Sequence, residues 1–387
     1  MTSLLENRIH SALEERRTAG TLRALSPRSA DDDSLNLADN DTLDLARDPS
    51  VIEAACAANR RWGCSSSASP LITGYTDAHN ALERTLCEWH GAPSCLVWNS
   101  GFTANQAVLG RLPAKGDLVL ADRLIHNSMI SGILGSGARL RRFRHNDLSG
   151  LEALLKNEAS GGRSVFVVTE TVYSMDGDYP DPARMAALKK RNPFFWVVDE
   201  AHATGWFGKT GAGLLEESGT SSHADVIVGT LGKALGSQGA YTLFRNERIR
   251  DYLINVAGEF IYSTYLPPAC AAAASTAVER CRELAASRHE WRTASSMFRR
   301  QLAADGWNVP DGDSPIVPVL AGDPGRTMSI AASLARSGIL VGAVRPPTVP
   351  PDTSRLRISL KRSLSDPDYA RIRAALARAS ESDSRIQ

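Results

Sequence analysis

Two apolar runs, each ending abruptly in a polar or glycine-rich turn, are the feature that most constrains the fold of this chain. The first run, residues 195–198, is Phe-Trp-Val-Val, and Asp199-Glu200-Ala201-His202 follows it at once. The second, residues 226–228, is Val-Ile-Val and leads into Gly229-Thr230-Leu231-Gly232-Lys233-Ala234-Leu235-Gly236. Short strands that are apolar on both faces are typical of parallel sheets, and ligands bind at the edge where such strands end. The pattern therefore predicts an α/β fold in which a carboxylate, an imidazole and a lysine meet at one sheet edge.

A lysine held near a carboxylate suits pyridoxal 5'-phosphate (PLP), a cofactor that bonds covalently to a lysine amine. Lys233 would supply the amine, and the glycines around it would let a flat ligand approach the backbone closely. Asp199 would keep the pyridine nitrogen of the cofactor protonated, so that the ring can accept electrons. These residue types in this order favour PLP as the cofactor.

A nucleotide-binding site is the first alternative, because Asp199-Glu200-Ala201-His202 also resembles the second acidic motif of a helicase. A P-loop should then precede this motif, but Gly208-Lys209-Thr210 lies after it and has Ala203 in place of the first P-loop glycine. Lys233 lies in no P-loop either, since Ile227 and Ala234 replace residues that such a loop needs. A solvated lysine in a glycine-rich loop is the other alternative, and the order of Asp199, His202 and Lys233 disfavours it.

The composition is that of an ordinary globular protein of 387 residues, with 43% hydrophobic and 22% charged residues. A formal net charge of +1 gives no reason to expect nucleic acid or an anionic membrane as a partner. The six cysteines form no Cys-x-x-Cys pair and no Cys/His metal spacing, so we expect no metal and a reducing, cytoplasmic location. No apolar run is long enough to span a bilayer, and acidic residues interrupt the N-terminal region, which argues against a signal peptide.

The succession of patterns predicts three parts. Residues 1–45 form an N-terminal helical arm, with helical periodicity from about Leu4 to Leu25. Residues 46–275 alternate helices with short apolar strands and form a large PLP-binding α/β domain with a mostly parallel sheet. Residues 276–387 form a smaller C-terminal α+β domain. The expected core strands are 96–98, 118–120, 165–168, 195–198 and 226–228, with 316–319, 340–342 and 356–359 in the smaller domain.

Further motifs carry a family resemblance. They are residues 99–106 (Asn-Ser-Gly-Phe-Thr-Ala-Asn-Gln), 122–126 (Asp-Arg-Leu-Ile-His), 144–147 (Arg-His-Asn-Asp), 174–178 (Ser-Met-Asp-Gly-Asp) after Thr169-Glu170, and 261–264 (Ile-Tyr-Ser-Thr). With the Asp199 and Lys233 segments they run nearly end to end, and on them the chain resembles the α-oxoamine synthases. These are PLP-dependent transferases of fold type I. The segments 345–350 and 355–359 favour the branch that acts in biotin biosynthesis.

The resemblance implies a cofactor site. Gly101 and Phe102 open a helix after a strand, so their free amides and the helix dipole would hold the phosphate. His126 would stack on the ring, and Ser174 and His202 would hydrogen-bond its phenolic oxygen. Ser263 and Thr264 would reach the phosphate in a partner subunit, which implies a homodimer with active sites at its interface. The implied cofactor-binding set is Gly101, Phe102, Asn105, His126, Ser174, Asp199, His202, Thr230, Lys233, Ser263 and Thr264, of which Lys233, His126, Asp199 and His202 are catalytic.

The resemblance also implies a reaction, the decarboxylative condensation of L-alanine with a pimeloyl thioester carried on coenzyme A or an acyl carrier protein. Lys233 would remove the alanine Cα proton, and His126 would donate a hydrogen bond to the thioester oxygen. Arg357 would hold the alanine carboxylate in a bidentate pair. The implied substrate-binding set is Arg23, Asn40, Arg345, Thr348 and Arg357.

Two segments depart from the family pattern. Residues 39–45 are Asp-Asn-Asp-Thr-Leu-Asp-Leu where the family has Ser-Asn-Asp-Tyr-Leu-Gly-Leu, and residues 64–70 are Cys-Ser-Ser-Ser-Ala-Ser-Pro where a glycine-rich turn is expected. Both lie near the active-site entrance in the family, so two alternatives stay open. One is another α-oxoamine synthase that uses a different acyl-CoA, or glycine or serine. The other is a catalytically inactive PLP-fold partner protein, against which the intact Lys233, Asp199 and His202 argue.

Overall fold

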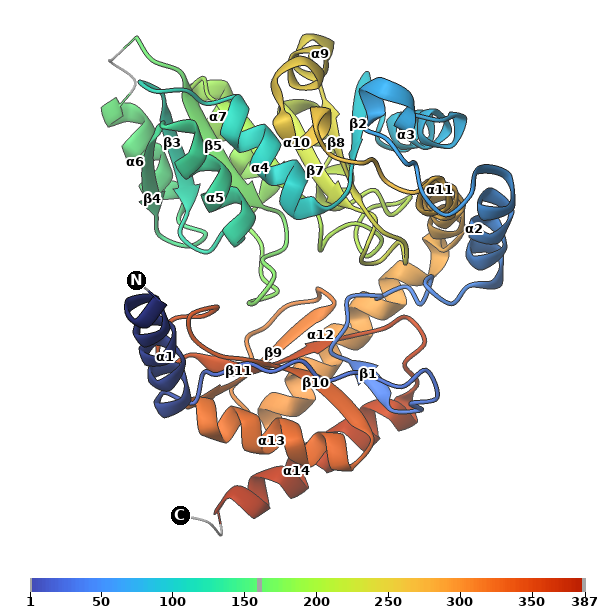
Figure 1. Ribbon diagram of the computed structural model, residues 1–387. Coiled ribbons are helices and arrows are strands. Elements are labelled where there is room, and N and C mark those ends of the chain that lie inside the picture. The colour runs from blue at the N-terminus through green and yellow to red at the C-terminus, as the bar shows by residue number, and fades with distance from the viewer. Residues whose placement is uncertain (1, 159–161, 385–387) are drawn as a thin grey trace. The chain divides into compact units, whose positions relative to one another are not determined.

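The computed structural model describes residues 2–158 and 162–384, which fall into two units (Figure 1). Unit 1 comprises Met1–Asp39, Thr293–Leu360 and Leu364–Gln387, and unit 2 comprises Asn40–Arg292 and Lys361–Ser363. The chain therefore passes between the units several times, and one of these passages lies inside a helix, α12 (Arg288–Ala304). The bounds expected from the sequence, 1–45, 46–275 and 276–387, stay a prediction.

Unit 2 is built on a seven-stranded sheet with the order β2-β8-β7-β6-β5-β3-β4. Its strands are β2 (Ser94–Trp98), β3 (Leu118–Asp122), β4 (Arg139–Phe143), β5 (Val165–Glu170), β6 (Phe195–Asp199), β7 (Val226–Thr230) and β8 (Ala240–Phe244). Strands β4, β3, β5, β6 and β7 run parallel to one another, whereas β8 is antiparallel to both of its neighbours, β2 and β7. This arrangement confirms the mostly parallel sheet.

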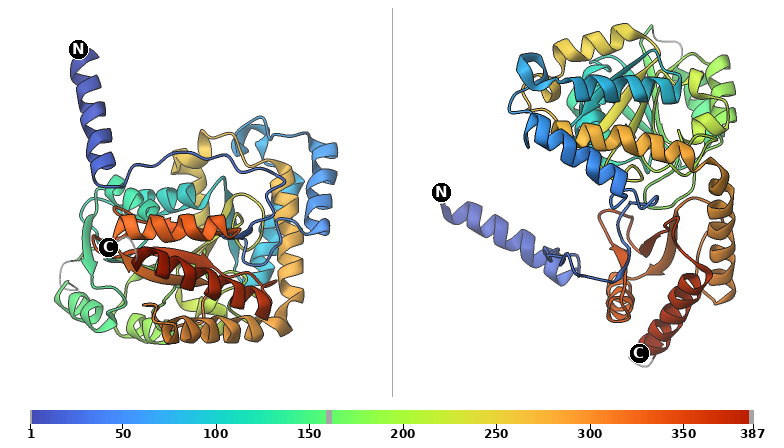
Figure 2. Two further views of the ribbon diagram at one scale, coloured as in Figure 1. Left: turned by 90° about the horizontal axis from the view of Figure 1, so that it is seen from below. Right: turned by 90° about the vertical axis from the view of Figure 1, so that its right-hand side faces the viewer.

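Unit 2 also contains helices, several of which pack on this sheet. They are α2 (Pro49–Trp62), the π-helix η1 (Pro70–Gly74), α3 (Asp77–His90), α4 (Gly101–Arg111), α5 (Asn127–Ser136), α6 (Leu148–Glu158), α7 (Pro182–Arg191), α8 (Leu214–Glu217), η2 (Ser221–His223), α9 (Glu247–Val256), α10 (Gly258–Ile261), α11 (Pro268–Glu283) and η3 (Ala285–Ser287). Helices α4 and α5 pack together, and α11 packs against α2 and α3 (Figures 1 and 2). The two tryptophans of the sheet are buried with their indole N–H groups satisfied, Trp98 by Thr242 (2.9 Å) and Trp196 by Thr169 (3.0 Å).

Unit 1 contains a four-stranded sheet with the order β1-β10-β11-β9. Its strands are β1 (Leu35–Leu37), β9 (Ile316–Gly322), β10 (Ile339–Val344) and β11 (Ser354–Ser359), and its helices besides α12 are α1 (Thr2–Thr18), α13 (Pro324–Arg336) and α14 (Asp366–Ser384). Strand β11 is antiparallel to β9 and β10, whereas β1 is parallel to β10. Helix α13 packs on this sheet and on α14 (Figure 1).

The N-terminal helix is shorter than the sequence suggested. Helix α1 ends at Thr18, whereas the periodicity predicted a helix to about Leu25. Gly20 follows with φ +64°, a left-handed conformation that commonly terminates helices. Leu5 and Ile9, which lie four residues apart on this helix, are about half exposed at 49% and 51%.

The departing segment 39–45 keeps a turn that normally requires glycine. Asp44, where the resembled family has glycine, has φ +51°, in the left-handed region that aspartate tolerates better than most residues. The turn is held by Asp41, whose carboxylate accepts hydrogen bonds from the amides of Leu45 (2.9 Å) and Ala46 (3.2 Å). Lys361 Nζ lies 3.5 Å from Asp44 Oδ1. The Asp41 carboxylate therefore holds the backbone of this turn in place.

Three further findings concern the described residues, 2–158 and 162–384. None of their helices combines the length and apolar character needed to cross a membrane. No group of three or more histidine, cysteine, aspartate or glutamate side chains among them is placed to hold a metal ion. All six cysteines lie in these ranges as free thiols.

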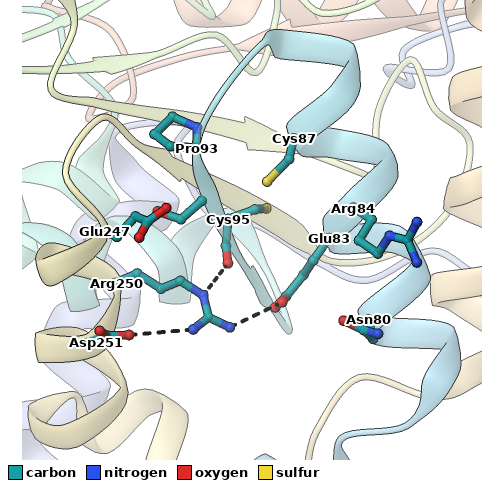
Figure 3. Close-up of a pocket in the computed structure, with 10 residues that line it drawn as sticks. Asn80, Glu83, Arg84, Cys87, Pro93, Cys95, Glu247, Arg250 and Asp251 are labelled. Carbon is teal, nitrogen blue, oxygen red and sulfur yellow. Dashed lines mark hydrogen bonds and ion pairs between the residues drawn. The ribbon is translucent and has the colours of Figure 1, made fainter.

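A cavity of about 360 Å³ in unit 2 lies between α3, β2 and α9 (Figure 3). Arg250 extends across it, donating to the Cys95 carbonyl (2.9 Å) and pairing with the buried Glu83 carboxylate (3.4 Å). Tyr75 also donates to Glu83 (2.9 Å). Burial raises the pKa of Glu83, and Arg250 opposes that rise. None of the predicted site residues lines this cavity, and its charged side chains hold α9 against α3 and β2.

We expect Arg250→Ala to lower the free energy of unfolding by about 2 kcal/mol, because the buried Glu83 carboxylate loses its cation. Urea unfolding followed by circular dichroism measures this change. Arg84→Ala is the matched control, since Arg84 lines the same cavity but is exposed, and its effect should stay within about 0.5 kcal/mol. Equal losses in the two variants would contradict a structural role for the Glu83–Arg250 pair.

Candidate active site

Four polar residues lie at the carboxyl ends of adjacent parallel strands in unit 2. Asp122 ends β3, Glu170 ends β5, Asp199 ends β6 and Thr230 ends β7. Glu170 and Asp199 are directly paired across β5 and β6. In open α/β sheets ligands bind outside the carboxyl ends of the strands. The sheet therefore places these groups where an α/β protein binds its ligand.

A cavity of about 160 Å³ opens at this edge. It is lined by Gly101, Phe102, Asn105, His126, Ser128, Glu170, Ser174, Asp199, Ala201, His202, Val228, Gly229, Thr230 and Lys233. All predicted cofactor-binding residues except Ser263 and Thr264 are among them. Although smaller than the cavity beside Arg250, it is the one that gathers the reactive groups.

Lys233 and His202 face each other in this cavity. Lys233 lies in a turn directly after β7, and its Nζ is 2.9 Å from His202 Nε2. The turn is closed by hydrogen bonds from the Ser237 amide to the Leu231 carbonyl and from the Gly236 amide to the Lys233 carbonyl, both 2.9 Å. The predicted proximity of the lysine and the imidazole is therefore a feature of the fold.

Two of the glycines near Lys233 serve the packing of the chain, which differs from the ligand-approach role suggested by the sequence. A Cβ at Gly229 would fall 2.1 Å from the Tyr241 ring on β8. Gly236 has φ +61°, and a Cβ there would lie 2.2 Å from the Ala46 amide nitrogen. A Cβ added at Gly232, by contrast, would have its nearest neighbour, the Ser237 carbonyl oxygen, at 3.6 Å. The backbone beside Lys233 is therefore open.

A chain of hydrogen bonds links Asp199 to His126. Asp199 Oδ2 accepts from the side-chain amide of Asn105 (2.9 Å), and Oδ1 accepts from the Ala201 amide (2.8 Å). The same Asn105 amide donates to Ser128 Oγ (3.1 Å), which lies 2.7 Å from His126 Nδ1. The backbone amide of Ser128 also donates to Nδ1 (3.3 Å). Because Nδ1 accepts this bond, the neutral ring carries its proton on Nε2.

Glu170 is a residue of the site that we did not predict, and Ser128 is another. Glu170 is only 2% exposed, and its carboxylate accepts from the His126 amide (2.6 Å) and from the backbone of Ser174. The available signal was the position of Glu170 at the end of an apolar run, as for Asp199. Ser128 gives no such signal, because its role depends on how α5 packs against α4.

The charges in the cavity influence one another. Burial raises the pKa of Glu170 well above its ordinary value, and the charge of Asp199 raises it further, whereas Lys233 lowers it. Burial lowers the pKa of the His126 imidazole; Asp199 opposes this shift and Lys233 adds to it. The lowered pKa favours an uncharged His126 at neutral pH.

The residues present fit PLP. Ser100 caps α4 by accepting a hydrogen bond from the Thr103 amide (3.1 Å), and the helix then begins with Gly101 and Phe102 at the cavity wall. A helix N-terminus suits a phosphate group. Among the described residues, Asn105 Oδ1 is a buried acceptor without a hydrogen-bond partner, and a Cβ at Gly101 would meet no heavy atom within 4 Å. The cavity thus offers an amine, a carboxylate, an anion-binding helix end and open space.

Ser263 and Thr264 do not line the cavity. The Asn99 side-chain amide donates to Ser263 Oγ (2.9 Å) and to the Thr264 carbonyl (2.7 Å). Thr264 is exposed. Their expected reach to the phosphate of a partner subunit stays a prediction.

The predicted substrate residues are divided between the units. Asn40 belongs to unit 2, where its carbonyl accepts from the Thr42 amide (2.9 Å). The other four belong to unit 1. Arg23 donates to Thr348 Oγ1 (2.9 Å), and Arg345 donates to the Gly20 carbonyl (2.6 Å), so the N-terminal segment and the 345–348 loop are tied together. Their contact with substrate stays a prediction.

Arg357 is buried in β11 at 6% exposure, and its guanidinium donates to Ser359 Oγ (2.8 Å). Burial lowers the pKa of Arg357 to about 10. A buried guanidinium favours an anionic partner, because pairing offsets the loss of hydration. This is the property expected of a residue that holds a carboxylate.

The chain is similar to known proteins in both sequence and structure. The family model described as aminotransferase class I and II matches residues 32–376. The 8-amino-7-oxononanoate synthase of Geobacter metallireducens is 40% identical over 347 residues, covering 89% of this chain and 88% of that protein.

Solved structures agree with this match. The 8-amino-7-oxononanoate synthase from Francisella tularensis has a TM-score of 0.78 and 28% identity, covering 92% of this chain and all of that one. A structure described as SPT with PLP has a TM-score of 0.90 and 25% identity, covering 97% of each chain. Both similarities extend over nearly the whole chain.

We expect two substitutions to move the pKa of His126 in opposite directions before PLP is added. Asp199→Asn should lower it further, because the imidazolium loses a neighbouring negative charge, and Lys233→Ala should raise it, because a positive charge is lost. Titration of the imidazole C–H resonances by NMR measures both shifts. Lys209→Ala, a change outside the cavity, is the control. Shifts in the same direction for both variants would contradict this electrostatic arrangement.

Proposed function

Because the chain belongs to the aminotransferase class I and II family, and within it to the α-oxoamine synthases, we propose that it condenses L-alanine with a pimeloyl thioester. The products would be 8-amino-7-oxononanoate, carbon dioxide and the free thiol, as a step of biotin biosynthesis. The observation that carries the proposal is the 40% identity to 8-amino-7-oxononanoate synthase over nearly nine-tenths of the chain, together with a cavity that holds Lys233, Asp199 and His202.

The enzyme depends on PLP, the cofactor present in the related SPT structure. When bound, PLP supplies an aldehyde that takes up the substrate amine and a protonated ring that withdraws electrons from the substrate Cα. Asp199 would pair with the ring nitrogen, and Asn105 orients that carboxylate through its 2.9 Å hydrogen bond. Gly101 and Phe102 would hold the phosphate, with Thr230 beside them, and Ser174 and His202 would hold the phenolic oxygen.

Lys233 is the group that we assign to proton removal from the Cα of alanine. A general base must lie within hydrogen-bond reach of the proton that it takes, and the turn after β7 directs Nζ into the cavity. His202 Nε2, 2.9 Å away, orients the amine. The same amine can later return the proton, because its position is fixed by the strand end.

His126 is the group that we assign to the thioester carbonyl. Its Nδ1 accepts from the Ser128 amide, so Nε2–H is the donor, and its lowered pKa keeps the ring neutral near pH 7. A neutral donor can stabilise the negative charge that develops on the carbonyl oxygen without first transferring its proton. The Glu170 carboxyl holds the backbone of His126 and therefore this geometry.

Recognition of the substrates would rest on arginines of unit 1. Arg357 would hold the alanine carboxylate, while Arg23 and Arg345, already linked through the 345–348 loop and Gly20, would hold the far end of the pimeloyl chain. A pimeloyl chain ends in a carboxylate or its ester, which suits guanidinium donors. Asn40 and Thr348 complete the proposed substrate set.

A homodimer in the cytoplasm is part of the proposal. Large apolar side chains are exposed on three adjoining elements of unit 2: Ile72 of η1 at 76%, Phe102 of α4 at 43% and Tyr262 after α10 at 85%. Such side chains favour a covered face. The free cysteines suit a reducing compartment. Either coenzyme A or an acyl carrier protein could carry the acyl group.

A second candidate, an α-oxoamine synthase that uses serine and a longer acyl chain, is favoured by one observation. The TM-score to the SPT structure is 0.90, against 0.78 for the Francisella 8-amino-7-oxononanoate synthase. Backbone similarity reports the fold, however, and the substrate is chosen by side chains. The higher sequence identity, 40%, belongs to an 8-amino-7-oxononanoate synthase.

Thiol release from a panel of thioesters tests the proposal. With L-alanine and PLP, the pimeloyl thioester should release thiol at least tenfold faster than acetyl or palmitoyl thioesters. Glycine or serine in place of alanine should lower the rate. Lys233→Ala is the control that should abolish turnover with every pair. A preference for serine with a palmitoyl thioester would support the second candidate and overturn the first.

The two arginines should affect different substrates. We expect Arg345→Ala to raise the KM for the pimeloyl thioester about tenfold and to leave the KM for alanine nearly unchanged, because the lost contact lies on the acyl side. Arg357→Ala should raise the KM for alanine instead, through loss of the carboxylate pair. Steady-state kinetics with each substrate varied in turn separate the two effects. The assignment would be wrong if both variants raised the KM for the same substrate.

A further inference from the structure

His145 lies between two carboxylates just outside the cavity. Its Nδ1 is 3.0 Å from Asp122 Oδ1, and its Nε2 is 2.9 Å from Asp178 Oδ2. The next residue strengthens this bridge: the Asn146 amide donates to Asp122 Oδ2 (2.8 Å), and the Asn146 side chain donates to Asp178 Oδ2 (2.8 Å). His145 itself does not line the cavity. It comes two residues after β4, the edge strand of the sheet.

Each of the two carboxylates belongs to a turn that carries a residue of the site. Asp122 begins the turn to His126, and its Oδ1 accepts from the Leu124 amide (2.8 Å). Asp178 ends the turn that contains Ser174. Its carbonyl accepts from the Tyr173 amide (2.9 Å), and the Gly177 amide donates back to the Tyr173 carbonyl (2.8 Å). The bridge through His145 therefore connects the bases of both turns.

The same two turns are tied a second time, on the cavity side. The Glu170 carboxylate accepts from the His126 amide and from the backbone of Ser174. Glu170 and His145 thus act on the same pair of turns from opposite ends. Without the His145 imidazole, the two turns would keep the Glu170 contact and the hydrogen bonds of Asn146, but they would lose the charged link between Asp122 and Asp178.

The charges around His145 favour its cationic form. Burial alone would lower the pKa of the imidazole, but the hydrogen bonds and charges of Asp122 from β3 and of Asp178 from the 173–178 turn raise it to about 10. The Tyr173 ring lies edge-on to the His145 imidazole, with 4.4 Å between the ring centroids. At neutral pH the bridge is therefore a cation between two anions, which is stronger than a pair of neutral hydrogen bonds.

We propose that His145 is a positioning residue of the PLP site, which it serves by fixing, through Asp122 and Asp178, the turns that present His126 and Ser174. This inference rests on the cofactor site proposed above and is independent of the acyl substrate. No substrate is needed to test it, so it can fail while the proposed reaction stands, and it can hold if the enzyme uses another acyl chain.

The test follows release of PLP from the purified holoenzyme of His145→Gln by visible absorbance, with no amino acid or thioester present. We expect the Kd for PLP to rise at least tenfold and the visible absorption band to shift, because His126 and Ser174 would no longer be held in position to contact the PLP ring. Double-mutant cycles then locate the effect. The loss of PLP affinity in His145→Gln should be less than additive with the loss in Ser174→Ala or in His126→Ala. It should be additive with the loss in Thr230→Val, since Thr230 lies on β7 outside both turns.

Controls separate positioning from a general loss of structure. His289→Gln, at an exposed histidine of α12, should leave PLP binding unchanged. If His145→Gln does not unfold cooperatively, Asp178→Asn replaces it, because that change weakens one link and leaves the Asp122 link in place. A folded variant with wild-type PLP affinity and spectrum would overturn the proposal. Full additivity with Ser174→Ala and with His126→Ala would overturn it as well.

Discussion

Glu170 and Asp199 lie side by side because β5 and β6 are parallel and in register, and the rest of the site depends on this pairing. Burial raises the pKa of Glu170, and the charge of the neighbouring Asp199 raises it further. The Glu170 carboxyl group accepts hydrogen bonds from the backbone of His126 and Ser174, while the side chains of Asp199 and Lys233 line the same cavity. The sheet register therefore places the two carboxyl groups next to each other in the wall of the cavity.

The reacting groups are supported mainly by regular structure. Lys233, Asp199 and Glu170 follow or end buried strands, and Asn105 lies in the first turns of α4, so their positions vary little. Arg23 and Arg345, which we propose for the acyl substrate, are held differently, by contacts between an irregular N-terminal segment and a loop. Loops of this kind can change without disturbing the strand ends.

Much of this fold could be predicted from the sequence, because its buried strands are continuous apolar runs with polar ends. The sequence did not predict β4, because its three arginines hide an edge strand. It did not predict β8 either, although all five of its residues are buried. The core of the site followed from Lys233, Asp199 and His202. Glu170 and Ser128 did not, since their importance comes from packing between elements that are distant in sequence. The bridge from His145 to Asp122 and Asp178 was not predicted either, because these residues are distant in sequence.

The pairing of β2 with β8 has a consequence for the order of events during synthesis. Strand β2 pairs with β8 alone among the described strands, so Ser94–Trp98 must wait for Ala240–Phe244 before it can join the sheet. In unit 1, β1 waits still longer for β10, which begins at Ile339. Because the chain leaves the ribosome from its N-terminus, early strands stay exposed while later ones are made, a situation that chaperones relieve. Unit 1, which carries Arg357, is then the last part to be completed.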